Sequence, residues 1–186
     1  MKNAHLKSHS VVNFSFRQRG ASLLEGIAYL AVAALVILGA VSLLTSAFSS
    51  AQSNRASEEV VSIRTGVRKL YTGQSNSYGT VDITANLNTA RIFPTTLTAN
   101  TAGTTTTMNN SWGGAVTVTG SGGGSTFTIA YTLVPQDACI NMISGASGWT
   151  QINVGGANAI TTFPATPADA NTACATATNN INFISR

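Results

Sequence analysis

The chain has 186 residues, which corresponds to one globular domain and an additional segment. Charged residues make up only 9% and hydrophobic residues 44%, so a chain kept unfolded by its own charge is excluded. The formal net charge of +4 comes entirely from the first 20 residues, and without them no basic excess is left for binding nucleic acid.

The distribution of catalytic residue types argues against an enzyme. Both histidines, His5 and His9, lie in the basic N-terminal segment. If that segment is removed, neither a Ser-His-Asp system nor a zinc site with imidazole ligands can form. Asp82, Asp137 and Asp169 are isolated carboxylates, so no paired acid and base are indicated. We therefore expect no catalytic, cofactor or metal site.

A long apolar segment follows the basic N-terminus. Ile27–Leu44 contains no charged residue and is long enough to cross a bilayer as a helix, and the basic residues before it predict that the N-terminus stays cytoplasmic. Three interpretations are open. The segment could be an uncleaved signal anchor, a signal peptide cut near Ser49–Ala51, or a helix that is kept after cleavage before it.

Glu25 favours the third interpretation. A carboxylate at the edge of a spanning helix is costly and indicates a functional partner. No basic residue follows it until Arg55. Cleavage between Gly20 and Ala21 would create an α-amino group four residues before Glu25, and this amine could reach Glu25 of a neighbouring chain.

These residues resemble the prepilin processing region of type IV pilins. The match consists of Arg19-Gly20, then Ala21-Ser22-Leu23-Leu24-Glu25, then an unbroken apolar helix. The resemblance implies that a membrane peptidase cuts after Gly20 and methylates the new N-terminus at Ala21. It also implies that Glu25 pairs with the N-terminal amine of the adjacent subunit. The 20-residue leader and the absence of Phe at the first mature position resemble the type IVb subclass.

The helix is predicted to run from about Ala21 to Tyr71, with apolar residues all round in its first half and on one face in its second. The apolar stripe of the second half consists of Ala56, Val60, Ile63, Val67 and Leu70. The charged residues expected largely off this stripe are Arg55, Glu58, Glu59, Arg64 and Arg68.

Residues 72–110 are expected to form a connecting region with loops, including one at Thr104–Thr107. Ile83–Phe93 has a weak helical spacing that Pro94 ends. The Ser111–Gly114 sequence, Ser-Trp-Gly-Gly, also resembles PilS-type type IVb pilins, which extends the resemblance over the whole chain.

The remainder predicts an α+β headpiece with an antiparallel sheet. Val116–Thr119 and Thr126–Leu133 alternate apolar and polar residues around a glycine-rich loop, which indicates a hairpin with Phe127, Ile129, Tyr131 and Leu133 on its buried face. Further short strands are expected at Trp149–Val154 and Ile181–Ile184. Short helices are expected at Ala138–Ile143 and after Thr166, with Thr166 as N-cap and Pro167 in the first turn.

Cys139 and Cys174 are the only cysteines and lie in the exported portion. There they either form a disulfide, closing a loop of about 36 residues, or remain two buried thiols; oxidising conditions favour the bond. By resemblance to the pilins, Cys139–Cys174 is the variable region that binds partners.

The sequence thus predicts a leader peptide at 1–20, a membrane-spanning and filament-core helix at 21–54, and a headpiece at 55–186. The expected function is that of a structural subunit of a type IVb pilus. The expected sites are the inner membrane before assembly and the extracellular filament afterwards. Alternatives are a type II secretion pseudopilin, which the absence of an acidic calcium loop disfavours, or a signal-anchored monomeric binding domain.

The resemblance also implies the partners of the protein. These are further copies of the chain, a prepilin peptidase, the inner-membrane pilus assembly machinery, and a receptor on a host or recipient cell or a minor tip adhesin. No nucleic acid and no cofactor are expected.

Overall fold

A computed structural model describes residues 22–74, 77–103, 105–156 and 158–186. The chain divides into two compact units, Met1–Leu43 and Leu44–Arg186. The first unit is described from Ser22 and consists of the beginning of helix α1, which spans Leu23–Tyr71. The long helix expected from the hydrophobic pattern is confirmed, and its expected first residue, Ala21, lies outside the described residues.

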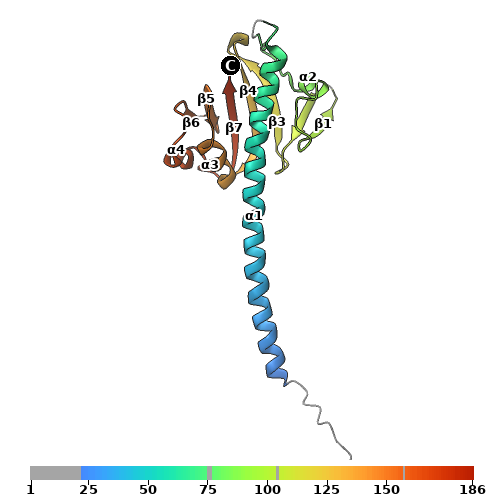
Figure 1. The fold of residues 1–186 in the computed structure, drawn as a ribbon, viewed down its shortest axis with the longest axis vertical. Helices are drawn as coiled ribbons and strands as arrows, with labels where there is room; N and C mark the ends of the chain where they lie inside the picture. The colour runs from blue at the N-terminus through green and yellow to red at the C-terminus, as the bar shows by residue number, and fades with distance from the viewer. Residues whose placement is uncertain (1–21, 75–76, 104, 157) are drawn as a thin grey trace, which may run out of the picture. The chain divides into compact units, whose positions relative to one another are not determined.

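The second unit is built on a seven-stranded antiparallel sheet with strand order β1-β2-β3-β4-β7-β5-β6 (Figure 1). The strands are β1 Thr98–Ala102, β2 Thr105–Asn109, β3 Ala115–Ser121, β4 Thr126–Pro135, β5 Gln151–Val154, β6 Asn158–Ile160 and β7 Thr178–Ser185. The C-terminal strand β7 lies between β4 and β5, so the end of the chain is inserted into the middle of the sheet. The expected α+β class is confirmed.

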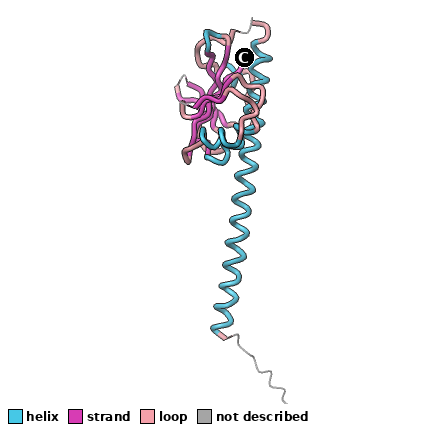
Figure 2. The backbone as a smooth tube through the Cα atoms, turned by 90° about the vertical axis from the view of Figure 1, so that its left-hand side faces the viewer, coloured by secondary structure: helices cyan, strands magenta, loops and turns pink. Residues whose placement is uncertain are grey.

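The part of α1 that belongs to the second unit lies against one face of the sheet (Figure 2). Ala56, Val60, Ile63 and Val67 are buried in one core with the inward residues of the strands, as the predicted stripe requires. Leu70 was wrongly placed on this stripe, since it is 40% exposed. The ring of Tyr71 packs on the core instead, 5.4 Å from the ring of Tyr78.

The central hairpin of β3 and β4 has the predicted buried face, with one correction. Phe127, Ile129 and Tyr131 are fully buried, but Leu133 is 50% exposed. The β4–β7 register shifts between Tyr131 and Val134, and Leu133 has a positive φ of 56°. This β-bulge adds one residue to the strand, so the inward alternation resumes at Val134.

The region 72–110 is more regular than the sequence predicted. The short helix α2, Thr84–Thr89, ends well before Pro94, and Arg91 after it has a positive φ of 55°. Strands β1 and β2 form a hairpin where loops were expected, and β2 joins the sheet through pairing of Met108 with Val116. The expectation of a loop was wrong for Thr105–Thr107, which belong to β2, while Thr104 lies outside the described residues. These strands have no alternating apolar residues that would identify them.

The C-terminal helices agree with the sequence. Helix α3 spans Gln136–Ser144 and helix α4 spans Pro167–Ala173. Thr166 caps α4, since its hydroxyl oxygen accepts a hydrogen bond from the backbone N–H of Asp169 at 3.2 Å, and Pro167 lies in the first turn.

The turn before β3 explains the Ser-Trp-Gly-Gly sequence. The Asn110 carboxamide oxygen accepts hydrogen bonds from the backbone N–H groups of Trp112 and Gly114, at 3.0 and 2.9 Å. Its amide nitrogen donates to the carbonyl of Thr132 at 2.9 Å. A Cβ on Gly114 would lie 1.9 Å from that same carbonyl oxygen, so only glycine fits here.

Candidate functional site

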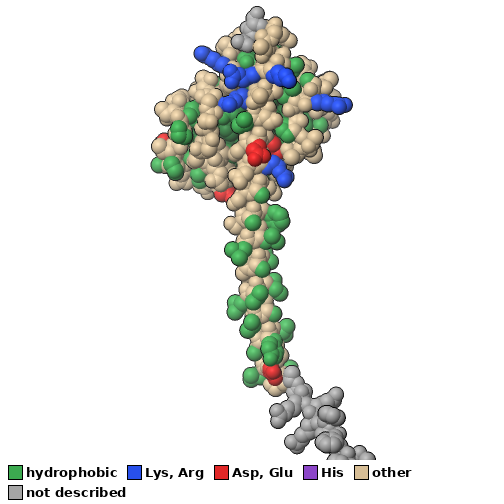
Figure 3. Space-filling view, in the orientation of Figure 1, with side chains coloured by type: hydrophobic (Ala, Val, Ile, Leu, Met, Phe, Trp, Pro, Cys, Tyr) green, Lys and Arg blue, Asp and Glu red, His purple; other side chains and the backbone are tan. Residues whose placement is uncertain are grey.

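The first part of α1 exposes apolar side chains on all sides. Within α1 the most apolar 18-residue window has a mean hydropathy of 2.6 and contains no buried residue. By length and composition α1 is the single helix among the described residues that could cross a membrane. Figure 3 shows hydrophobic side chains distributed along this part of the helix. Its exposure, for example 85% for Leu23 and 76% for Leu43, indicates a surface that is covered by lipid or by another protein chain.

Glu25 is the one charged residue between Ser22 and Asn54. The hydroxyl of Tyr29, one helical turn later, donates a hydrogen bond to the Glu25 carboxylate at 3.3 Å. The Ser22 hydroxyl oxygen accepts from the backbone N–H of Glu25 at 3.3 Å, as in a helix N-cap. Tyr29 is a partner that the sequence analysis missed, although its i, i+4 spacing from Glu25 is visible in the sequence. Gly20 and Ala21 lie outside the described residues.

A second carboxylate of α1, Glu59, is buried in the headpiece. It is 4% exposed, contrary to its predicted place off the apolar stripe. The hydroxyl of Thr96 donates to one carboxylate oxygen at 2.5 Å and that of Tyr131 to the other at 3.3 Å. Burial raises the pKa of Glu59, while the two hydrogen bonds and the charge of Arg55 act in the opposite direction.

The hydrogen bonds of Glu59 with Thr96 and Tyr131 join α1, strand β4 and the segment after Pro94. Burial of the phenol raises the pKa of Tyr131 well above its ordinary value, and the charge of Glu59 and the hydrogen bond to it raise that pKa further. Glu59 comes three residues after Ala56 and four before Ile63, so its position on the buried face was readable from the helical period.

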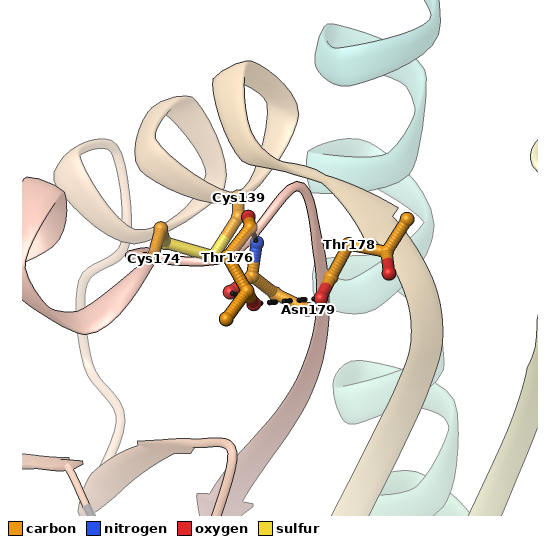
Figure 4. Close-up of a disulfide and its surroundings, with 5 residues drawn as sticks. All are labelled: Cys139, Cys174, Thr176, Thr178 and Asn179. Atoms are coloured by element: carbon orange, nitrogen blue, oxygen red, sulfur yellow. Dashed lines mark hydrogen bonds between the residues drawn. A yellow bond between two sulfur atoms is a disulfide. The ribbon is translucent and has the colours of Figure 1, made fainter.

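The disulfide between Cys139 and Cys174 connects α3 to the end of α4 (Figure 4). The two Cα atoms are 6.0 Å apart, which is an ordinary separation for a disulfide. The chain that follows is held by Asn179, whose amide nitrogen donates to the carbonyl of Thr176 at 2.8 Å. The hydroxyl of Thr176 donates to the carbonyl of Thr178 at 2.7 Å. The disulfide therefore fixes the region 139–174 at the start of the central strand β7.

Arg64 ties α1 to the same region. Its guanidinium lies over the ring of Trp149, 4.5 Å from the ring centre, and donates to the carbonyl of Ser147 at 3.0 Å. Burial and then the nearby charge of Arg68 lower the pKa of Arg64. Arg64 was expected off the buried stripe, and it lies at the edge of that stripe rather than in solvent.

No group of three or more His, Cys, Asp or Glu residues that could hold a metal ion occurs in the part of the chain that the structure describes. The molecule instead combines an exposed apolar helix, an antiparallel sheet packed on the same helix, and a disulfide near the C-terminus.

Comparison with known proteins identifies the family. Residues 50–186 match the family model described as "PilS N terminal". The major structural subunit of bundle-forming pilus from Escherichia coli O127:H6 is 32% identical, with 89% of this chain and 93% of that protein covered. The same subunit from Escherichia coli O111:H- matches to the same extent.

The solved structures agree. The type IV b pilin from Salmonella typhi has a TM-score of 0.53 and 27% identity, covering 66% of this chain and 91% of that chain. TcpA, a type IV pilin from Vibrio cholerae, has a TM-score of 0.54 over 73% of this chain and 99% of that chain; at 13% identity it supports the fold alone. The chain belongs to the type IVb pilin family. It is therefore a self-associating structural protein and not an enzyme, and neither the pseudopilin nor the monomeric alternative is favoured.

Proposed function

We propose that this chain is made as a membrane-anchored precursor and becomes the repeating subunit of an extracellular type IVb pilus. In this proposal residues 1–20 form a leader, residues 21–54 span the inner membrane and later line the filament core, and residues 55–186 form the headpiece. A prepilin peptidase cuts between Gly20 and Ala21 and methylates Ala21, and the inner-membrane assembly machinery then extracts the subunit.

The observation that carries this proposal is Glu25, the single charged residue in the exposed apolar part of α1 before Arg55. An ionised carboxylate in a filament core costs several kcal/mol unless it is paired. The amine of Ala21 of a neighbouring subunit would supply the opposite charge. Apolar helices that slide along one another make similar apolar contact at many axial offsets, but the two charges can pair at only one of them. Such a pair would therefore set the register of assembly.

The test is filament yield from Glu25→Leu and Glu25→Gln, with Glu58→Gln as the control that removes an exposed acid from the same helix outside the apolar part. We expect both Glu25 variants to be cleaved, inserted and disulfide-bonded, yet to assemble few or no pili, while Glu58→Gln assembles normally. Normal pili from Glu25→Leu would overturn the pairing. In a separate variant, Gly20→Glu should block cleavage, and protein of mature mass from it would refute the processing site.

We further propose that the filaments associate side by side and mediate adhesion, aggregation or contact between mating cells. The curated relatives named for a bundle-forming pilus support the lateral association. The region 139–174 is the proposed surface for a receptor on a host or recipient cell or for a minor tip adhesin. Alanine substitution of exposed residues there should reduce cell binding without reducing pilus number.

A further inference from the structure

Strand β1, Thr98–Ala102, is an edge strand that buries none of its own residues. All five residues are exposed, and within the described part of the chain the strand pairs with β2 alone. A strand normally gains stability by burying at least one face, and an edge strand with neither face buried is marginal. The other edge of the strand presents a row of backbone N–H and C=O groups to solvent.

This edge carries no charged residue and no proline, two of the features that protect exposed strands. Natural edge strands carry lysine, other charged residues or proline, which prevent pairing with further chains. β1 has none of these, and no charged residue occurs between Arg91 and Asp137, a segment that also supplies β2, β3 and β4. Two copies approaching through this side of the sheet therefore meet no charge repulsion from these strands. The opposite edge, β6, is only three residues long.

We propose that β1 is the contact between pili, where it pairs antiparallel with β1 of a second copy of this chain in a neighbouring filament. A two-fold contact of this kind requires the same surface on both partners, which an uncharged strand satisfies. The backbone groups supply the hydrogen bonds, as in other cases of strand addition. In pairing centred on the strand, the middle residue Asn100 lies opposite Asn100 of the partner.

This geometry makes a prediction about charge. Like charges directly opposite each other across two strands are destabilising, and opposite charges are stabilising. Asn100→Lys places two lysines face to face, and Asn100→Glu places two glutamates face to face. Each change weakens one contact by up to about fivefold, and the many contacts along two filaments multiply this loss. Mixing the two variants places lysine opposite glutamate.

The experiment measures filament number and bundle width by electron microscopy of sheared pili. The matched control is Gln74→Lys, an exposed position after the end of α1 that receives the same charge and lies outside both β1 and the region 139–174. We expect Asn100→Lys and Asn100→Glu each to form wild-type numbers of single, unbundled filaments. We expect bundles to return when the two preparations are mixed, and Gln74→Lys to bundle normally.

This inference rests on the proposed function. Measuring filament number and bundle width separately distinguishes failure of the β1 contact from failure of the proposed function. Bundles of normal width from Asn100→Lys would overturn the β1 contact while leaving the pilus intact, as would a mixture that does not bundle. Loss of bundling in Gln74→Lys would show a general effect of charge and would equally overturn the β1 contact. Loss of the filaments themselves from both Asn100 variants would place β1 inside one filament and also overturn the contact between filaments. A wild-type chain that forms no filaments would instead refute the proposed function.

Discussion

The first and second halves of α1 belong to one continuous helix but bury their side chains in different ways. No residue of α1 before Ser53 is buried, whereas Ala56, Val60, Ile63 and Val67 are almost inaccessible. The first half has apolar residues all round, and the second has one stripe. Helical propensity is similar in both, so the difference shows that the helix serves two environments, one supplied by other molecules and one supplied by its own sheet.

Two glycines of the helix, Gly39 in its first half and Gly66 in its second, show the same contrast. Around Gly39 there is nothing within 4 Å of an added Cβ. At Gly66 an added Cβ would lie 2.4 Å from Cγ2 of Ile92, a partly buried side chain that packs on the core. Gly66 is therefore required by the close approach of the segment after α2, and Gly39 has no such role within the subunit.

The contrast between the halves predicts the largest difference for truncated isoleucines. Ile63→Ala should lower the free energy of unfolding of the headpiece by about 2–5 kcal/mol, because it leaves a cavity in the core. Ile37→Ala, at a position 61% exposed, should leave it unchanged. Urea unfolding of the full mature protein in detergent, followed by tryptophan fluorescence, measures both. Equal effects would contradict the division of the helix.

Removing the disulfide tests whether the headpiece is stabilised independently of the exposed half of α1. Cys174→Ser should lower the free energy of unfolding by about 3–4 kcal/mol on the chain-entropy model, because the open loop is no longer constrained when unfolded. The double variant Cys139→Ser with Cys174→Ser is the control for the unpaired thiol and should show the same loss. Insertion of the apolar helix into membranes should not change. Unaltered unfolding in the double variant would contradict this prediction.

Gly39→Ala and Gly66→Ala should change the stability of the protein in opposite directions. Gly39→Ala should favour the helix by up to about 1 kcal/mol. Gly66→Ala gains the same propensity but forces Ile92 to move, at a cost of about 1–3 kcal/mol, so a net loss is expected. Combining Gly66→Ala with Ile92→Ala should remove the clash, and the two effects should therefore be less than additive. Circular dichroism melting of the parent, the three single variants Gly39→Ala, Gly66→Ala and Ile92→Ala, and the double variant measures this. A stabilised Gly66→Ala would be inconsistent with the close approach.

Glu59 predicts a smaller, pH-dependent effect. Because its folded pKa is raised, the group contributes stability that is present below its unfolded value of about 4.5 and is lost as the pH rises through the folded pKa. Glu59→Gln removes the titration and keeps the shape. The slope of unfolding free energy against pH should therefore be less negative above about pH 4.5 in Glu59→Gln than in the parent, by at most about 1.4 kcal/mol per pH unit. Identical slopes in urea unfolding would contradict a raised pKa.

Local patterns in the sequence were sufficient for the elements with strong periodicity. The 49-residue helix, the stripe from Ala56 to Val67, the hairpin of β3 and β4, and the Thr166 cap all follow from spacing and capping rules that act within a few residues. The expectation of an exported pilus subunit likewise came from Gly20, Ala21 and Glu25, which are neighbours in the sequence.

Tertiary structure decided the features that depend on distant partners. Strands β1 and β2 have no alternating apolar pattern, and they are strands because they pair with each other and β2 pairs with β3. Leu133 faces outward because the register with β7 shifts. Glu59 lies on the buried face that the helical period indicates, but its hydrogen-bond donors, Tyr131 and Thr96, are 72 and 37 residues away and are not visible in the local pattern. Each of these depends on contacts between segments far apart in the chain, which a local pattern does not encode.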